Sequence, residues 1–142
     1  MATAPRISVI IPTCNRRDKL LRLLLALRAQ AVPPGSFEVI VADDGSRDGT
    51  GEAVASLLPR FPGLSYLPGK NRGQGAARNR GLRSARGEIL GFIDDDCLPD
   101  REWIARALPY FDDPAVGGVQ GLTWCDVREI SALTMQVRNL ED

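Results

Sequence analysis

Short apolar runs rich in β-branched residues alternate along this chain with segments in which apolar residues recur every three or four positions. Runs of the first kind predict strands, and periodic segments predict helices. The predicted strands are Ile7–Ile11, Glu38–Ala42, Leu64–Leu67, Ile89–Ile93 and Val116–Leu122, and the predicted helices are about Arg17–Ala31, Thr50–Leu58, Gln74–Ser84 and a segment that begins near Asp100. This alternation predicts an α/β domain with a mostly parallel central sheet flanked by helices.

Polar clusters follow three of the predicted strands. Pro12-Thr13-Cys14-Asn15-Arg16 comes after the first, Asp43-Asp44-Gly45-Ser46 after the second, and Asp94-Asp95-Asp96 after the fourth. The carboxyl ends of parallel strands lie at one edge of a sheet, and ligands of open α/β sheets bind there. We therefore expect the three clusters to meet at one site.

The composition narrows the chemistry. The 142 residues are enough for one domain. Because 18 basic residues balance 18 acidic ones, no nucleic-acid partner is indicated. The absence of histidine excludes a histidine base, a histidine-containing triad and a histidine-ligated zinc site. No apolar run is long enough to span a membrane, and the three cysteines form no C-x-x-C pair. We expect a cytoplasmic chain, although a longer parent could be membrane-associated.

The carboxylates of Asp94, Asp95 and Asp96 are the strongest sign of a metal site. Close carboxylates repel each other by up to about 4 kcal/mol per pair where the effective dielectric constant is near 20. In an extended backbone Asp94 and Asp96 would point to one side and Asp95 to the other. Mg²⁺ and Mn²⁺ bind one or two carboxylates together with phosphate oxygens and water. The triplet thus predicts a divalent metal held against a diphosphate, and a solvated acidic turn is the alternative.

The other polar segments also have two interpretations. We expect Asp48 to cap the helix that follows it and Asp44 to contact a ligand. The small residues of Gly73-x-Gly75 open a predicted helix whose N-terminus favours anions, and Arg78 could reach a phosphate or a base. The segment lacks the third glycine of a dinucleotide fingerprint, and the chain has no P-loop motif, so both of those nucleotide-binding classes are excluded.

Four sequence blocks occur in a specific order: Ser8–Arg16, Val39–Ser46, Asn71–Asn79 and Phe92–Asp96. Together they resemble the family 2 glycosyltransferases of GT-A fold, and the resemblance covers the chain up to about Leu122. It implies a Rossmann-like GT-A domain that is truncated at its C-terminus. Residues 1–122 would be the core of this single domain, and residues 123–142 the start of an acceptor-side region.

The resemblance also implies an activity and a set of functional residues. The protein would transfer a sugar from a nucleoside diphosphate sugar, first of all a UDP-sugar, to a hydroxyl of a glycan, lipid or other acceptor, with Mn²⁺ or Mg²⁺ as cofactor. Asp44 would bind the base, Arg78 would lie beside the nucleotide, and Asp96 would be the principal metal ligand, assisted by Asp94. The donor-binding set would be Pro12, Thr13, Asn15, Asp43, Asp44, Asn71, Arg78, Asp94 and Asp95. Cys14 stands where family members often have an aromatic residue, which leaves the base preference open.

The residues expected to bind the acceptor and supply the general base are less complete in this sequence than the donor-binding residues. In inverting members of the family a later acidic residue is the general base, and here the candidates are Asp126, Glu141 and Asp142. We therefore expect the chain to bind donor but to transfer little sugar, and to self-associate through apolar surface near Val116–Leu122 and Ile130–Val137. One alternative is a nucleotide-binding module without turnover. A remote one is a haloacid-dehalogenase-like phosphatase, which would need a lysine that this chain lacks after Lys70.

Overall fold

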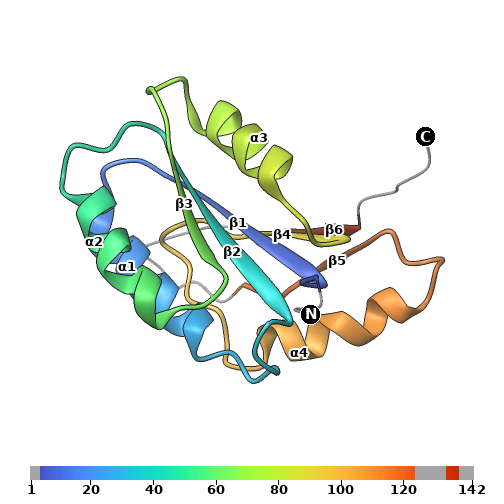
Figure 1. Ribbon diagram of the computed structural model, residues 1–142. Coiled ribbons are helices and arrows are strands. Elements are labelled where there is room, and N and C mark those ends of the chain that lie inside the picture. Colours follow the sequence, from blue (N-terminus) through green and yellow to red (C-terminus); the bar gives the residue numbers. More distant parts are fainter. Residues whose placement is uncertain (1–3, 124–133, 138–142) are drawn as a thin grey trace.

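The computed structural model describes residues 4–123 and 134–137 of the chain. Within these residues one sheet has the strand order β3-β2-β1-β4-β6-β5 (Figure 1). The strands are β1 (Ile7–Thr13), β2 (Phe37–Asp43), β3 (Leu64–Pro68), β4 (Ile89–Phe92), β5 (Gly118–Gln120) and β6 (Thr134–Val137). Strand β1 pairs in parallel with β2 and β4, and β2 pairs in parallel with β3. The predicted α/β domain with a mostly parallel sheet is confirmed.

The far edge of the sheet differs from the prediction. The strand predicted at Val116–Leu122 is only Gly118–Gln120, and it does not extend the parallel part of the sheet. Instead β6 lies between β4 and β5 and is antiparallel to both. Local hydrophobic pattern cannot show this insertion, because Ile89 pairs with Val137, a residue far along the chain.

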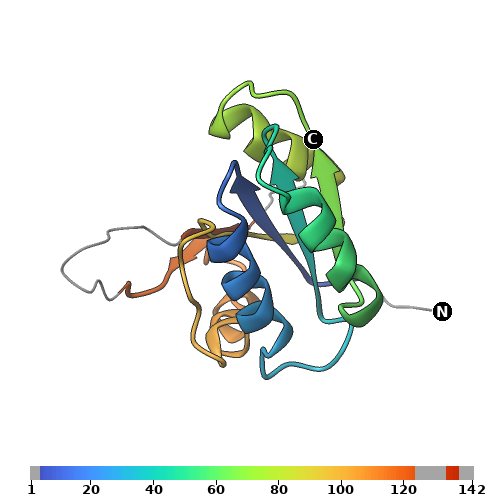
Figure 2. The ribbon, with the colours of Figure 1, turned by 90° about the vertical axis from the view of Figure 1, so that its left-hand side faces the viewer.

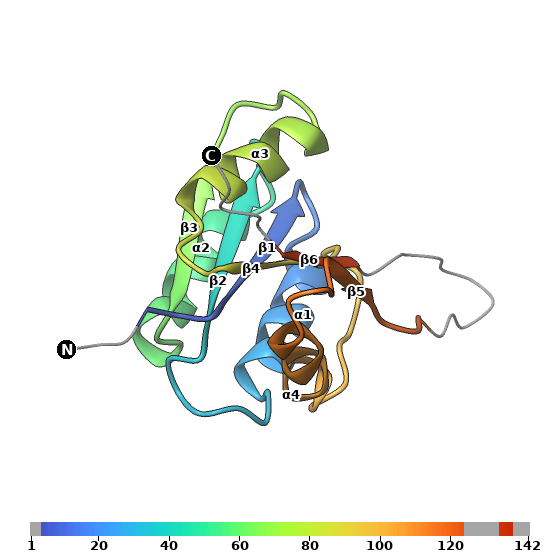
Figure 3. The same ribbon diagram turned by 90° about the vertical axis from the view of Figure 1, so that its right-hand side faces the viewer.

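Helices cover both faces of the sheet (Figures 2 and 3). Helix α3 (Gln74–Ser84) packs on one face against β1 and β2, whereas α1 (Arg17–Arg28), α2 (Thr50–Leu57) and α4 (Trp103–Ala107) contribute to the core on the other. Two 3₁₀ segments, Leu58–Arg60 and Leu108–Asp112, extend α2 and α4. Among the described residues, no helix is both long and apolar enough to cross a membrane.

Two helix boundaries differ from the predicted ones. Helix α1 ends at Arg28 rather than Ala31, since the amide of Ala31 donates to the carbonyl of Arg101 instead of to the helix. Helix α4 begins at Trp103 rather than near Asp100, because the Asp100 carboxylate accepts the Glu102 amide in the turn before the helix. Tertiary contacts and side-chain capping therefore decided both ends.

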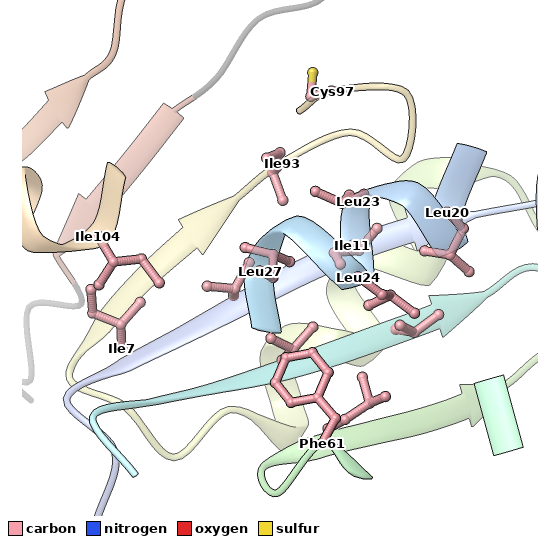
Figure 4. Packing of buried hydrophobic residues seen from close by; sticks show 14 of the residues in the cluster. Ile7, Ile11, Leu20, Leu23, Leu24, Leu27, Phe61, Ile93, Cys97 and Ile104 are labelled. Atoms are coloured by element: carbon pink, nitrogen blue, oxygen red, sulfur yellow. The ribbon is translucent and has the colours of Figure 1, made fainter. Parts of the chain in front are cut away.

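The main core lies between the sheet and α1 (Figure 4). Every residue of β1 is buried, as expected for a central parallel strand covered on both faces. Ile7, Val9 and Ile11 face the leucines of α1, which are Leu20, Leu23, Leu24 and Leu27. On the opposite face Gly81 lets α3 approach the sheet, since a Cβ there would be 2.7 Å from Cγ2 of Ile10.

The region predicted to favour self-association is partly described. Leu122 is 90% exposed. A groove of about 820 Å³ is lined by residues that include Trp103, Tyr110, Val119 and Leu122. The side chains of Ile130–Val137 lie outside the described residues, so self-association stays a prediction.

Candidate functional site

A cavity of about 360 Å³ lies at the carboxyl ends of β1, β2 and β4. Its lining residues are Pro12, Thr13, Cys14, Arg16, Asp44, Gln74, Asp94, Asp95 and Asp96. The three polar clusters thus meet at one edge of the sheet, as the sequence predicted. Of the residues proposed from the sequence, Asn15, Asp43, Asn71 and Arg78 do not line this cavity.

Thr13, the last residue of β1, joins the two acidic clusters. Its carbonyl accepts the Asp44 amide at 2.9 Å, and its hydroxyl donates to Oδ2 of Asp95 at 2.8 Å. Both Thr13 and Asp95 are buried. The end of the central strand therefore fixes the acidic residues that follow β2 and β4 relative to each other.

The acidic triplet forms a turn rather than an extended segment. Strand β4 ends at Phe92, and the Cys97 amide donates to the Asp94 carbonyl at 3.0 Å. The expected extended backbone is wrong, and so is the expectation that Asp95 would point away, because Asp94, Asp95 and Asp96 all line the cavity. Instead Asp95 and Asp96 share a contact with Arg16, whose Nη1 lies 3.2 Å from Asp95 Oδ1 and 3.3 Å from Asp96 Oδ2.

Arg78 is the cation beside Asp94. Its Nη2 is 3.6 Å from Asp94 Oδ1, and its guanidinium carbon lies 5.9 Å from the centre of the Phe92 ring. Its Nε is buried and makes no hydrogen bond with the described part of the chain. Arg78 is thus held next to the triplet by an ion pair and an aromatic contact.

Asp44 has an internal role in addition to its place in the cavity. Its two carboxylate oxygens accept the amides of Arg72 at 2.7 Å and Gly73 at 2.8 Å. Gly45 has a φ of +89°, and a Cβ there would be only 3.0 Å from the Asn71 amide nitrogen, so the loop before α3 packs directly on this turn. Asp44 therefore holds that loop against the site and keeps further lone pairs for a ligand.

Asp43 and Asp48 organise the backbone around the site. The buried Asp43 accepts the Ser46 amide at 2.8 Å and the Tyr66 hydroxyl, and burial together with this carboxylate raises the pKa of Tyr66. Asp48 accepts the hydroxyl and amide of Thr50 at the start of α2 and the amide of Arg17 at the start of α1. The Thr50 hydroxyl and the Arg17 amide lower the pKa of Asp48. Asp48 thus binds amides at the starts of two helices, but the N-cap position of α2 is held by Gly49, without a side-chain cap bond, rather than by Asp48 as predicted.

Asn15 and Asn71 both lie in loops with positive φ, 52° and 21° respectively. The Asn15 side-chain oxygen accepts the Arg47 amide at 2.7 Å. The backbone amide of Asn15 donates to the Ser46 hydroxyl at 2.8 Å. Asn15 thus ties the loop after β1 to the loop after β2. The candidate bases Asp126, Glu141 and Asp142 lie outside the described residues.

Gln74 was not assigned to the site from the sequence, whereas Cys14 and Arg16 were included only as members of the cluster after the first strand. Burial and the negative charge of nearby carboxylates, chiefly Asp44 and Asp43, raise the pKa of Cys14, so it is a neutral thiol at pH 7. One feature of the sequence indicated that Arg16 could belong to the site, because it is a cation in the polar cluster that follows the first strand. Only the fold shows that it reaches the triplet.

The carboxylates of the triplet suit a metal bound together with a phosphate. No group of three or more His, Cys, Asp or Glu residues in the described part of the chain could hold a metal ion by itself. Mg²⁺ and Mn²⁺ need only one or two carboxylates when phosphate and water complete the shell. Burial, which outweighs the Thr13 and Arg16 contacts, raises the pKa of Asp95. The side chain of Asp96 is 20% exposed and that of Asp95 only 7%, so Asp96 is the more accessible ligand.

Comparisons with known proteins agree with this arrangement. Residues 8–133 match the model of the family described as Glycosyl transferase family 2. Glycosyltransferase AglE of Haloferax volcanii is 36% identical over 121 residues, which cover 84% of this chain and 40% of AglE.

Solved structures give the same result. Mannosyltransferase PcManGT from Pyrobaculum calidifontis, in complex with GDP-Man and Mn²⁺, aligns with a TM-score of 0.82 and 30% identity over 96% of this chain and 45% of that one. Staphylococcus aureus TarS 1–349 in complex with UDP-GlcNAc aligns with a TM-score of 0.78 and 30% identity, over 89% and 37% respectively. The chain thus spans less than half the length of these three relatives.

Proposed function

Since this chain belongs to glycosyl transferase family 2, we propose that it forms the donor-binding side of a metal-dependent enzyme that moves a sugar from a nucleoside diphosphate sugar to a hydroxyl acceptor. The observation that carries the proposal is the single cavity in which Thr13, Asp44 and the acidic triplet meet. Family membership also removes the haloacid-dehalogenase-like alternative. A nucleotide-binding module without turnover remains the second candidate, because it would use the same cavity.

Each part of the donor has a matching group. Asp44 accepts hydrogen bonds from the base with the lone pairs that Arg72 and Gly73 leave unused. Arg78 lies beside Asp94, and its partly exposed guanidinium suits a phosphate. Asp96, assisted by Asp94, holds Mn²⁺ or Mg²⁺, and the bound ion neutralises charge on the departing nucleoside diphosphate.

The remaining residues orient the triplet and the surrounding loops or form the wall of the cavity. Thr13 and the buried Asp95 fix the triplet relative to β1. Asn15, Asp43 and Asn71 shape the loops from outside the cavity lining. Pro12 contributes to the wall of the cavity. The general base on the acceptor side is proposed among Asp126, Glu141 and Asp142.

UDP is the first nucleotide to test and GDP the second. The two solved structures most relevant to the choice hold UDP-GlcNAc and GDP-Man. Cys14 lines the cavity beside Asp44, and its thiol lies 3.7 Å from the Asp44 carbonyl. The wall near Asp44 therefore offers no aromatic surface at this position for stacking on a base.

Calorimetry with UDP and with GDP, each in Mn²⁺ and in EDTA, tests the proposal. We expect one nucleotide to bind in Mn²⁺ and to lose measurable affinity in EDTA and in Asp96→Asn. Asp113→Asn is the matched control, because Asp113 is exposed and accepts the Ala115 amide through an oxygen that asparagine retains. Equal affinity in Mn²⁺ and EDTA, or in wild type and Asp96→Asn, would count against the metal site. Sugar transfer measured after binding then separates an enzyme from a binding module.

A further inference from the structure

Arg16 occupies the space between two carboxylates of the triplet. It lies just before α1, outside the helix, and lines the cavity. One nitrogen, Nη1, contacts both Asp95 Oδ1 at 3.2 Å and Asp96 Oδ2 at 3.3 Å. The side chain is 51% exposed, so it has room to change its position.

This contact competes with a metal ion. A guanidinium between adjacent carboxylates offsets their mutual repulsion. A divalent cation on the same oxygen of Asp96 would face the positive charge of Arg16 at a distance of a few ångströms. A divalent ion on Oδ2 of Asp96 would compete with Arg16 for the lone pairs of that oxygen, and repulsion between the two cations would favour release of Arg16 from Asp96.

The released side chain has a suitable new partner. A guanidinium binds phosphate through two parallel, charge-assisted hydrogen bonds. Arg16 already lines the cavity in which the diphosphate of the donor is proposed to lie. The same residue that opposes metal binding before the donor arrives can therefore favour the donor afterwards.

We propose that Arg16 is a positioning residue that exchanges partners: it neutralises Asp95 and Asp96 before the metal binds, and it pairs with the donor diphosphate once the metal takes Asp96. This inference rests on the proposed metal and donor sites. It makes metal and diphosphate each strengthen the binding of the other by the same factor, as linkage requires.

The test measures binding, without turnover. Free Mn²⁺ is counted by electron paramagnetic resonance in titrations of wild type, Arg16→Gln, Arg16→Lys and Arg17→Gln. UDP, or GDP if that is the nucleotide bound, is then titrated at saturating Mn²⁺. Arg17 is the matched control, since it carries the same charge at the next position and contacts Asp18 and Asp48 rather than the triplet.

In the absence of nucleotide, Arg16→Gln should bind Mn²⁺ about fivefold or more tightly than wild type. At saturating Mn²⁺ it should bind the nucleoside diphosphate more weakly, so that the coupling between the two ligands falls. Arg17→Gln should change neither affinity, and Arg16→Lys should keep Mn²⁺ affinity near that of wild type because the charge remains. Thermal unfolding of each variant shows that the fold is intact.

Arg16→Gln with unchanged or weaker affinity for Mn²⁺ alone would overturn the exchange, as would the absence of detectable Mn²⁺ binding in both proteins. Asp96→Asn separates this failure from failure of the proposed function. If Asp96→Asn abolishes Mn²⁺ binding while Arg16→Gln behaves as wild type, the metal site stands and the role of Arg16 is wrong. If Asp96→Asn binds Mn²⁺ as wild type does, the proposed metal site itself is wrong.

Discussion

The hydroxyl of Thr13 donates to the carboxylate of Asp95 at 2.8 Å, across 82 positions of sequence. Thr13 ends the central strand β1, and Asp95 lies in the turn after β4. Because both residues are buried, this bond links the position of the acidic triplet to a strand that is buried along its whole length.

Replacing Thr13 by valine should therefore destabilise the protein. Valine has nearly the same shape but no donor, so the buried Asp95 carboxylate would lose one of its partners. We expect the free energy of unfolding to fall by about 1–3 kcal/mol, measured by urea denaturation. Thr13→Ser retains the hydroxyl and should keep nucleotide affinity in Mn²⁺. A valine variant that unfolds at the same urea concentration as wild type would show that the bond contributes nothing.

Asp44 should control the loop before α3. Asp44→Ala removes the acceptor of the Arg72 and Gly73 amides. Hydrogen bonds to a charged group contribute about 1.5–3 kcal/mol, so these two amides should exchange with solvent roughly 10 to 100 times faster. Hydrogen exchange followed by NMR measures this rate. The Arg86 amide, held by Glu38, should exchange as in wild type, and unchanged rates at Arg72 and Gly73 would contradict the assigned role.

Gly81 should tolerate no side chain, in contrast to Gly75 on the same helix. A Cβ at Gly81 would lie 2.7 Å from Ile10 Cγ2, whereas nothing lies within 4 Å of one at Gly75. Gly81→Ala should lower the free energy of unfolding by about 1–3 kcal/mol through overpacking. Gly75→Ala should raise it by up to about 1 kcal/mol through helix propensity. Thermal or urea unfolding of the pair gives the answer, and equal effects would argue against the close packing of α3 on β1.

Glu38 should make the free energy of unfolding depend on pH in the acidic range. Burial alone would raise its pKa, but hydrogen bonds from Ser8 and Arg86 outweigh burial and hold the pKa below the usual value of 4.5. A lowered pKa in the folded state gives stability that is present above the usual pKa and is lost as pH falls through the folded one. Wild type should thus exceed Glu38→Gln in stability by about 1–3 kcal/mol at pH 7.

That difference should shrink as the pH falls from about 5 toward 3. Urea denaturation of both proteins at several pH values measures it. A difference that stays constant over this range would mean that the ionised form of Glu38 is not the one that the folded state prefers.

Several features of the fold could be predicted from local pattern. The spacing of Leu20, Leu23, Leu24 and Leu27 predicted a helix with one buried face, and that face forms the core. The boundaries of α3 agree with the prediction, because Gly73 before it and the extended Ala85 after it limit the helix locally. The C-terminal end of α1 differs from the prediction because the Ala31 amide binds the Arg101 carbonyl. The start of α4 differs because the Asp100 carboxylate binds the Glu102 amide in the turn before the helix.

The sequence by itself determined the alternation of β1 to β4 with helices along the chain, and with it the meeting of Thr13, Asp44 and Asp96 at one edge, because parallel strands end on the same side. Only the tertiary structure decided how the polar atoms pair. The turn after β4 brings Asp95 and Asp96 to Arg16, Asp44 turns to the amides of Arg72 and Gly73, and β6 enters beside β4. Each of these contacts joins residues far apart in the chain, and their geometry depends on how the whole sheet and its loops pack, which no local pattern of residues contains.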